Sequence, residues 1–318
     1  MNLDHDILTL FGGILGILTV ASTIGAVLKA KVTSESGRKV VENLVARTNA
    51  WWVMAALFAT AIVLGSVATL LMFAFASFLA LREFITLTPT RRGDHRSLFW
   101  AFFIILPLHY WILGTKWYGL SVLLIPVYAY LFIPMRAALA GDTEHFLERT
   151  SKVQWGLMVS VYFLSYAPAL LTLLPIPGWS DEHPERNARL LFFLVFVVQI
   201  SDVMQYVWGK LCGKRPIVPN LSPNKTVEGF IGGGLSATAI GAALWWATPF
   251  SPLAAAGLSA VIVVMGFFGG LVMSAIKRDR GVKDYGDLIP GHGGVMDRVD
   301  SLCFAAPVFF HIVRWVYT

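Results

Sequence analysis

Charged residues and cysteines are both scarce in this sequence of 318 residues. Asp, Glu, Lys and Arg make up only 14% of it, whereas a soluble domain carries about 25%. The two cysteines, Cys212 and Cys303, are too few for a disulfide framework, and no C-x-x-C spacing indicates a metal site. Hydrophobic residues, by contrast, make up 56% of the chain. This composition excludes an ordinary soluble domain and predicts an integral membrane protein with reduced thiols.

Apolar stretches long enough to cross about 30 Å of hydrocarbon, which takes roughly 20 helical residues, recur along the chain. The clear ones are 7–28, 153–174, 189–208, 227–247, 252–273 and 302–317. Two longer stretches, 51–81 and 99–133, are expected to fold into helical hairpins at Gly65-Ser66 and at Gly114-Thr115-Lys116. The sequence therefore predicts an all-α, polytopic membrane protein with about ten transmembrane helices, in a range of about eight to ten.

The distribution of Lys and Arg predicts the orientation of these helices. Five expected loops contain 20 of the 25 Lys and Arg residues: 31–50, 82–98, 134–152, 209–225 and 275–301. Cytoplasmic loops of membrane proteins carry this excess of Lys and Arg. We therefore expect these loops in the cytoplasm and both termini on the non-cytoplasmic side, and we do not expect nucleic-acid binding from the net charge of +6. Residues 1–6 lack the basic region of a secretory signal, so the first apolar stretch is expected to be a retained helix.

Polar residues that suggest chemistry gather in the last third of the chain. We expect an N-terminal transmembrane region, residues 1–188, with no assigned role, and a C-terminal catalytic region, residues 189–318, with cytoplasmic loops 209–225 and 275–301. Asp202 lies within the apolar run of the catalytic region. An unpaired carboxylate there costs at least about 2.5 kcal/mol, so it is a candidate functional residue. The alternative is an Asp that packs between helices and is satisfied by a neighbouring Ser, Gln or Tyr.

The second polar feature is LSPNKTVEGFIGGG, residues 221–234, which leads from a loop into a helix. Ser222 or Asn224 is expected to cap that helix. Lys225 and Thr226, together with the free N–H groups of the first turn, predict a phosphate site. Four glycines favour close helix packing: Gly229, Gly232, Gly233 and Gly234. The segment is not a Walker A loop, because G-x-x-x-x-G-K-[ST] is absent.

The third feature is SAIKRDRGVKDYGDLIPGHGGVMDRVDS, residues 274–301. Asp297 and Asp300 lie three residues apart, so a helix would place both carboxylates on one face, with Cβ atoms about 5–6 Å apart. Like charges this close favour a cation between them, and carboxylate oxygens suit Mg²⁺. Asp202 and Asp284 are candidate further ligands. The candidate phosphate-binding cations are Lys277, Arg278, Lys283 and Arg298.

The glycine-rich turn at 290–294 would let a ligand approach the backbone closely. The alternative is a solvated basic loop that forms no site: lipid headgroups hold the loop in place, and its acidic residues have no role. Taken together, the three features predict a site for a nucleoside triphosphate, one or two divalent ions and a lipid phosphate. The residues indicate phosphoryl or nucleotidyl transfer and identify neither the base nor the lipid.

The same residues resemble the signature of the phosphatidate cytidylyltransferases (CDP-diacylglycerol synthases): S-x-x-K-R, four residues, K-D, then P-x-H-G-G-x-x-D-R-x-D. The fixed positions are Ser274, Lys277, Arg278, Lys283, Asp284, Pro290, His292, Gly293, Gly294, Asp297, Arg298 and Asp300. Residues 222–233 are similar to a second block of the family, S-P-x-K-T-x-E-G-x-x-G-G. The resemblance covers residues 200–301. One departure is that the family pattern D-[ST]-x-A-Y reads Asp202-Val203-Met204-Gln205-Tyr206 here, with bulkier residues at the small positions.

The resemblance implies the reaction of CTP with phosphatidate to give CDP-diacylglycerol and pyrophosphate, with Mg²⁺ as cofactor and a second cation left open. It implies Mg²⁺ ligands at Asp297, Asp300 and Asp202. It implies catalytic residues at Asp297, Asp300, Asp284 and Lys283. The implied substrate-binding residues are Ser222, Lys225, Thr226, Ser274, Lys277, Arg278, His292, Gly293, Gly294 and Arg298. The expected partners are CTP, phosphatidate or a related lipid phosphate, and membrane lipids, with a homodimer left open. The expected location is the bacterial inner membrane, with the active site facing the cytoplasm.

Three alternatives stay open. A CTP-dependent lipid kinase of the polyprenol or phytol type would use a similar architecture, but the K-D, H-G-G and D-R-x-D elements disfavour it. A cytidylyltransferase for another lipid phosphate would perform the same chemistry. A non-catalytic lipid-binding or transport homologue is disfavoured because the polar residues gather at one side of the bilayer and do not continue across its midplane.

Overall fold

The computed structural model describes residues 5–289 and 291–318. Residues 1–4 of the acidic N-terminus and Pro290 of the signature therefore lie outside the described residues. Most of the described chain is α-helical. The helices are α1 (His5–Lys31), α2 (Glu35–Leu64), α3 (Ser66–Thr86), α4 (His95–Trp100), α5 (Leu106–Gly114), α6 (Tyr118–Leu123), α7 (Tyr130–Ala138), α8 (Phe146–Leu157), α9 (Leu164–Thr172), α10 (Asn187–Cys212), α11 (Val227–Ala243), α12 (Pro252–Asp279) and α13 (Met296–Tyr317).

Short π-helical segments make three continuous rods out of six of these helices. Ala101–Ile105 joins α4 to α5, Leu124–Ala129 joins α6 to α7, and Met158–Phe163 joins α8 to α9. Nine helical segments of the described chain are long and apolar enough to cross a membrane, and α11 is shorter, with 17 residues. The all-α, polytopic prediction is confirmed, with nine candidate spans in place of ten. The side on which the termini lie stays a prediction.

The predicted helical breaks are confirmed, but the loop predicted at 31–50 is wrong. Gly65 separates α2 from α3 with a φ of +102°, a conformation that favours glycine. The second break follows Gly114, where α5 ends. In place of a loop at 31–50, α2 begins at Glu35 and is capped by the Ser34 hydroxyl, which accepts the N–H of Gly37 at 3.2 Å. Hydropathy missed this start because the first turns of α2 are charged, although their residues suit a helix.

The two predicted catalytic loops are also shorter than expected. After α10, the strands β1 (Pro216–Val218) and β2 (Ser222–Thr226) form a small antiparallel hairpin. The cap of α11 is Thr226, which accepts the N–H of Gly229 at 3.1 Å, and neither Ser222 nor Asn224 takes this role. The signature loop is reduced to residues 280–295, because α12 continues to Asp279 and α13 begins at Met296.

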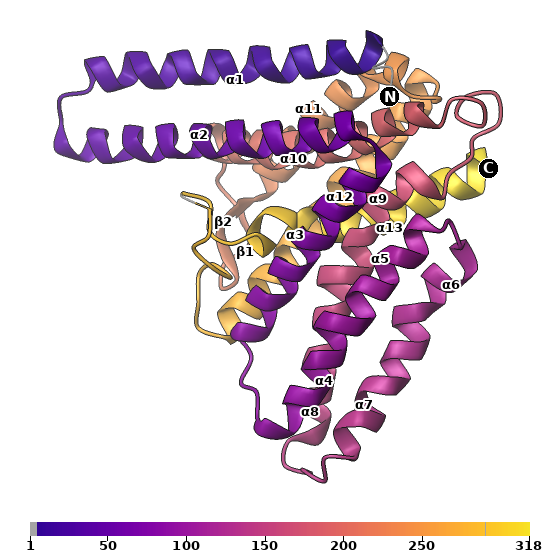
Figure 1. The fold of residues 1–318 in the computed structure, drawn as a ribbon. Coiled ribbons are helices and arrows are strands. Elements are labelled where there is room, and N and C mark those ends of the chain that lie inside the picture. The colour runs from indigo at the N-terminus through magenta and orange to yellow at the C-terminus, as the bar shows by residue number, and fades with distance from the viewer. Residues whose placement is uncertain (1–4, 290) are drawn as a thin grey trace.

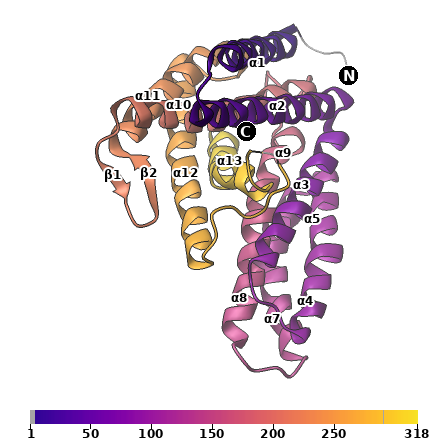
Figure 2. The same cartoon turned by 90° about the vertical axis from the view of Figure 1, so that its left-hand side faces the viewer.

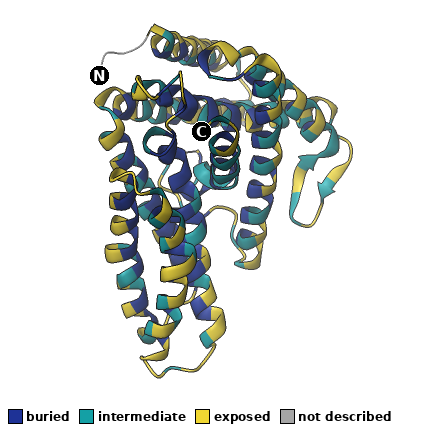
Figure 3. Cartoon of the chain, turned by 90° about the vertical axis from the view of Figure 1, so that its right-hand side faces the viewer, coloured by how far each residue is buried: buried dark blue, intermediate teal, exposed yellow. Residues whose placement is uncertain are grey.

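Helices α1 and α2 lie side by side as an antiparallel hairpin across the upper end of the other helices (Figures 1 and 2). The rod made by α8 and α9 is the most buried candidate span, with 78% of its apolar window inside the protein. It forms the centre against which α3 and α13 pack. Buried residues face this centre, and exposed residues follow the outer faces of the helices (Figure 3). Many of these exposed residues are large and apolar, as lipid contact requires: examples are Leu8, Val53, Leu71 and Leu235.

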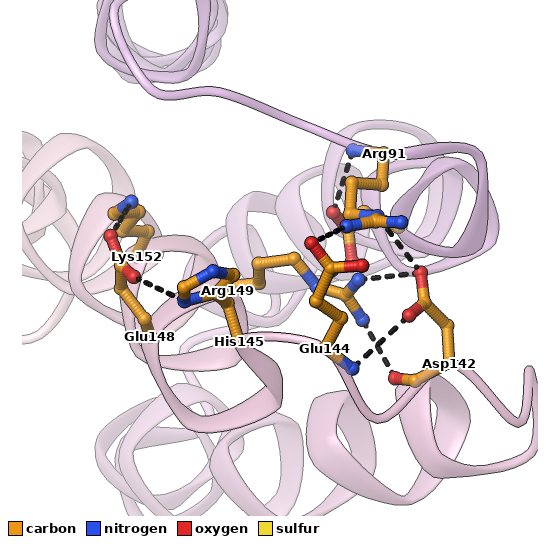
Figure 4. A network of polar contacts seen from close by, with 8 residues as sticks. Arg91, Asp142, Glu144, His145, Glu148, Arg149 and Lys152 are labelled. Carbon is orange, nitrogen blue, oxygen red and sulfur yellow. Dashed lines mark hydrogen bonds and ion pairs between the residues drawn. The ribbon is translucent and has the colours of Figure 1, made fainter.

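A network of ion pairs ties together the connections at the lower end of α4, α7 and α8 (Figure 4). Arg149 is 6% exposed, and its guanidinium contacts Asp94 at 3.2 Å and Asp142 at 2.6 Å. Arg91 contacts the same Asp142 oxygen at 3.2 Å. The hydrogen bond from Arg149 lowers the pKa of Asp142. The positive and negative charges of this network compensate one another. We therefore assign it a structural role: it holds together the connection before α4 and the connection between α7 and α8.

The glycines of α11 allow this helix to contact the backbone of α10. A Cβ atom at Gly233 would lie 2.5 Å from the Cα atom of Gln205, and one at Gly232 would lie 2.7 Å from the ring of Trp208. The predicted close packing at these glycines is therefore confirmed. The first turn of α11 lies against Gln205 and Gly209, because Gly229 contacts both residues. Asp202 lies about one turn before Gln205 along α10.

A methyl group at Gly233 is expected to destabilise the protein. The substitution Gly233→Ala should lower the free energy of unfolding by about 1–3 kcal/mol, because neither backbone can yield to the added methyl group. Gly257→Ala in α12 is the matched control, since a Cβ there would meet nothing within 4 Å, and it should leave the Tm unchanged or higher. Thermal unfolding in detergent measures both variants. Equal Tm values for the two would contradict this account of the contact.

Candidate active site

Five helices and one strand surround a cavity of about 500 Å³. The helices are α2, α10, α11, α12 and α13, and the strand is β2. Eight of the residues predicted from the sequence line this cavity: Asp202, Ser222, Lys225, Thr226, Ser274, Asp297, Arg298 and Asp300. The fold therefore brings the three polar features of the sequence to one place.

Ser301 links Asp202 to Asp300. Its hydroxyl donates to Oδ2 of Asp202 at 3.1 Å, and its backbone N–H donates to Oδ1 of Asp300 at 2.7 Å. Ser301 is buried, whereas Asp202 is exposed to the cavity even though α10 is a candidate membrane span. Each of these hydrogen bonds uses one carboxylate oxygen. The second oxygen of each acid is therefore left for a ligand.

Lys225 extends from β2 along α12 toward this acid pair. Its Nζ lies 3.5 Å from the carbonyl oxygen of Phe267 and 4.8 Å from the centre of the same residue's ring. A Cβ at Gly270 would lie 2.8 Å from Nζ, so the glycine makes room for the ammonium group. Desolvation by burial lowers the pKa of Lys225, and the charges of Asp202 and Asp300 oppose this shift. A bound phosphate would act in the same direction as the two acids and favour the charged lysine.

Asp297 is buried and saturated with donors. Its Oδ1 accepts from Nζ of Lys277 at 2.7 Å, and its Oδ2 accepts the backbone N–H of Tyr285 at 2.7 Å and of Gly294 at 3.0 Å. The side chains of Lys277 and Asp297 are 10% and 3% exposed. This carboxylate therefore joins α12 to α13 and holds the signature loop at two points, Tyr285 and Gly294.

The arrangement fits a divalent cation that is bound together with a polyphosphate. The described residues contain no group of three or more His, Cys, Asp or Glu side chains that could hold a metal ion by themselves. Mg²⁺, however, is commonly bound through one or two carboxylates together with substrate phosphates and water. Asp202 and Asp300 supply such a pair, since both line the cavity and each has an oxygen that Ser301 does not use.

Other predicted residues do not line the cavity. Lys277 is committed to Asp297, and Arg278 donates to the carbonyl of Val282 at 2.7 Å. Lys283 and Asp284 are exposed on the signature loop. The others are His292, Gly293 and Gly294. Among the lining residues, Ser274 donates its hydroxyl to the Gly270 carbonyl of its own helix at 2.6 Å. The catalytic and binding roles assigned to these residues stay predictions.

Three residues of the N-terminal region that were not predicted from the sequence contact the site. Arg47 and Trp51 of α2 line the cavity, and the Trp51 ring meets the ring of His292 edge-on, with centres 6.2 Å apart. Glu83 of α3 contacts the start of α13. Arg47 was assigned to a loop. Glu83 lay two residues beyond the apolar run that ended at 81, and an acid so close to a membrane span is the signal that identified Asp202.

Comparison with known proteins is consistent with this geometry. The model of the cytidylyltransferase family matches residues 45–316. A protein of Escherichia coli (strain K12), named "Uncharacterized protein YnbB", is 38% identical over 317 residues, which cover 98% of this chain and 99% of that protein.

Several relatives carry the name phosphatidate cytidylyltransferase, and two of them illustrate the extent of the match. The one from Mycobacterium leprae is 44% identical over 177 residues, which are 54% of this chain and 53% of the relative. The one from Aquifex aeolicus is 38% identical over 152 residues, which are 48% of this chain and 55% of the relative. These matches span about half the length of each protein. The family match covers far more, and by it this chain belongs to the cytidylyltransferase family.

Proposed function

We propose that the protein is a phosphatidate cytidylyltransferase that makes CDP-diacylglycerol and pyrophosphate from CTP and phosphatidate. The observation that carries the proposal is the meeting of Asp202, Asp300 and Lys225 in one cavity at the end of membrane-spanning helices. An acid pair and an ammonium group suit a metal-bound triphosphate. The family match and the two relatives named for this activity support the assignment.

In the proposed reaction, a phosphate oxygen of phosphatidate attacks the α-phosphorus of CTP. A new bond forms between that oxygen and the α-phosphorus, and the bond from the α-phosphorus to the oxygen that bridges to the β-phosphate breaks. Pyrophosphate leaves with the electron pair of the broken bond. A phosphomonoester is largely ionised at neutral pH, so no side chain has to remove a proton from the nucleophile.

The residues of the cavity would have two roles: they would position the substrates and neutralise the charge of the triphosphate. Mg²⁺, held by Asp202 and Asp300, would neutralise the triphosphate and polarise its α-phosphate. Lys225 and Arg298 would bind phosphate oxygens, including those of the leaving pyrophosphate. Asp297 would act indirectly, by positioning the signature loop, because hydrogen-bond donors already occupy both of its carboxylate oxygens. A homodimer and a second cation remain part of the expectation.

The lipid substrate is proposed to enter from the side of α10 and α2. Val203 and Tyr206 of α10 line the cavity and are 43% and 62% exposed. Arg47 of α2 also lines the cavity. An apolar opening with a cation beside it suits an acyl chain that is joined to a phosphate. We propose that this opening lies on the cytoplasmic side of a bacterial inner membrane, where CTP is made. The expected location of both termini on the other side requires the shorter α11 to cross the membrane as a tenth span.

A second candidate is the same nucleotidyl transfer to a different lipid phosphate. The observation that favours it is the place of Val203 and Gln205, which depart from the family pattern and both line the cavity. Bulkier residues at these positions would change the space next to Asp202. The reaction and the metal site would be unchanged.

Isotopically labelled CTP is expected to distinguish the reaction classes. Purified protein in mixed micelles with phosphatidate and Mg²⁺ should incorporate label from α-labelled CTP into lipid and release the γ label as pyrophosphate. Label transferred to lipid only from γ-labelled CTP would make the protein a kinase. If phosphatidate accepts neither label, other lipid phosphates and polyprenol are the next substrates to supply, and silence with all of them would contradict an enzymatic role.

The substitution Asp300→Asn is expected to reduce kcat by at least about 100-fold, because it removes one of the two carboxylates proposed to hold the metal. Asp300 is a sharper choice than Asp297, whose loss would break a buried ion pair and destabilise the fold. The control is Asp287→Asn, which removes an exposed acid from the same loop. The rate is measured against Mg²⁺ concentration after treatment with a chelator. Wild-type turnover by Asp300→Asn would exclude the metal assignment.

The substitution Arg47→Gln is expected to raise the KM for phosphatidate about tenfold and to change the KM for CTP little, since it removes one charge-assisted hydrogen bond to the lipid phosphate. Arg38→Gln provides the comparison, because Arg38 is an exposed cation of the same helix that does not line the cavity. Steady-state kinetics in mixed micelles give both constants. An equal effect of the two substitutions would mean that the charge of α2 acts only by attracting anionic lipid.

A further inference from the structure

Glu83 of α3 is an acid that is only 9% exposed, at a distance of more than 200 residues from the signature it contacts. Its Oε1 accepts the backbone N–H of Val295 at 2.9 Å, and its Oε2 accepts the N–H of Met296 at 2.8 Å. Val295 is the residue that precedes α13, and Met296 is its first residue. Both oxygens of a buried carboxylate are therefore used on the first turn of one helix.

The first N–H groups of a helix have no partner within the helix, and they carry partial positive charge. A side chain of the same segment usually provides the cap. The residue before α13 is Val295, which has no side-chain oxygen, so its own side chain cannot do so. Glu83 supplies the missing acceptors and a negative charge from a neighbouring helix.

The contact between Glu83 and the signature is tight. A Cβ atom at Gly294 would lie 2.5 Å from Cδ of Glu83, and one at Gly286 would lie 3.1 Å from its Oε1. Both glycines belong to the loop 280–295, so the backbone of the loop closes directly around this carboxylate. The second glycine of the H-G-G element, which the sequence suggested as room for a ligand, is in contact with Glu83.

We propose that Glu83 is a positioning residue that sets where α13 begins and thereby where Asp300 stands in the cavity. The inference rests on the proposed function for its catalytic consequence. Asp300 lies four residues after Met296, one helical turn beyond the capped N–H. Asp297 fixes the preceding loop through the N–H of Gly294. Two carboxylates, one from α3 and one from α13, thus accept the N–H groups of three consecutive residues, 294–296, at the start of the helix.

Glu83→Gln is the informative substitution. An amide keeps one acceptor oxygen but turns an NH₂ group toward a backbone N–H, so one hydrogen bond is lost and two donors meet. The expected result is a kcat lower by about 10- to 100-fold and a higher Mg²⁺ concentration for half-maximal stabilisation by CTP, as for other residues that orient a metal ligand. Glu83→Asp, which keeps the charge and both oxygens, should recover part of the loss.

The matched control is Ser77→Ala, six residues earlier on α3. Ser77 is buried and forms a 2.7 Å hydrogen bond with the hydroxyl of Tyr110, so its loss should weaken the packing of α3 without touching the signature. The expected result for this control is a lower Tm with unchanged kcat and Mg²⁺ dependence. If Glu83→Gln behaves in the same way, losing stability alone, Glu83 is only structural and the proposal is overturned.

Amide hydrogen exchange separates this proposal from the proposed function. In Glu83→Gln, exchange should become faster at residues 291–300, and the centre of α3 should stay as protected as in the wild type. This readout needs no turnover. If the wild type fails to use CTP and phosphatidate but shows this local change, the proposed function fails and the cap stands. Unchanged amide exchange at residues 291–300 would contradict the proposed capping role of Glu83.

Discussion

The ion pair between Lys277 and Asp297 is the contact on which the candidate site depends. Both groups are almost completely buried, and burying separated charges in a protein interior costs several kcal/mol each. The cost is offset only because Asp297 also receives two backbone N–H groups, from Tyr285 and Gly294. Removal of either partner would leave the other charged and buried. The pair therefore holds α12, α13 and the loop between them as one unit.

This pair also divides the work between the two acids of the D-R-x-D element. Asp297 faces Lys277 and the loop, so its oxygens are occupied, whereas Asp300 lies one turn further along α13, beside Asp202. A three-residue spacing places the two acids near one another on the helix. They nevertheless meet different surroundings, because the start of the helix is wrapped by its own loop and the next turn faces the cavity. The same pattern in the sequence thus yields one structural acid and one acid available to a ligand.

The sequence predicted the structural features that depend on a single residue or on a short segment. The break at Gly65 and close helix packing at Gly233 follow from what a glycine permits, and both were predicted from the sequence, whereas the partner helix α10 was not. The start of α2 at Glu35 was not predicted, because hydropathy detects apolar residues and is blind to a charged helical extension. This error hid Arg47, which the sequence placed in a loop and the structure places on the cavity wall.

The sequence predicted several residues of the site, but it did not predict the contacts that position them. Asp202, Lys225 and Asp300 were each recognised from their local context, and the cavity contains all three. The partner of Asp297 and the role of Glu83 depend on which helices meet in three dimensions. Glu83 is separated from Met296 by 213 positions, and no periodicity or spacing within one segment connects them. Contacts of this kind follow from tertiary packing alone.

The family match includes the N-terminal residues that contact the site. The match begins at residue 45, two positions before Arg47, and runs to 316. Every residue that lines the cavity in the described part of the chain lies within it, as does Glu83. The described residues outside its N-terminal limit, 5–44, form α1 and the first turns of α2 and line no part of the cavity. Arg47 and Trp51 of α2 and Glu83 of α3 therefore contact the site that α10 to α13 form, and the division of the chain at residue 188 stays a prediction.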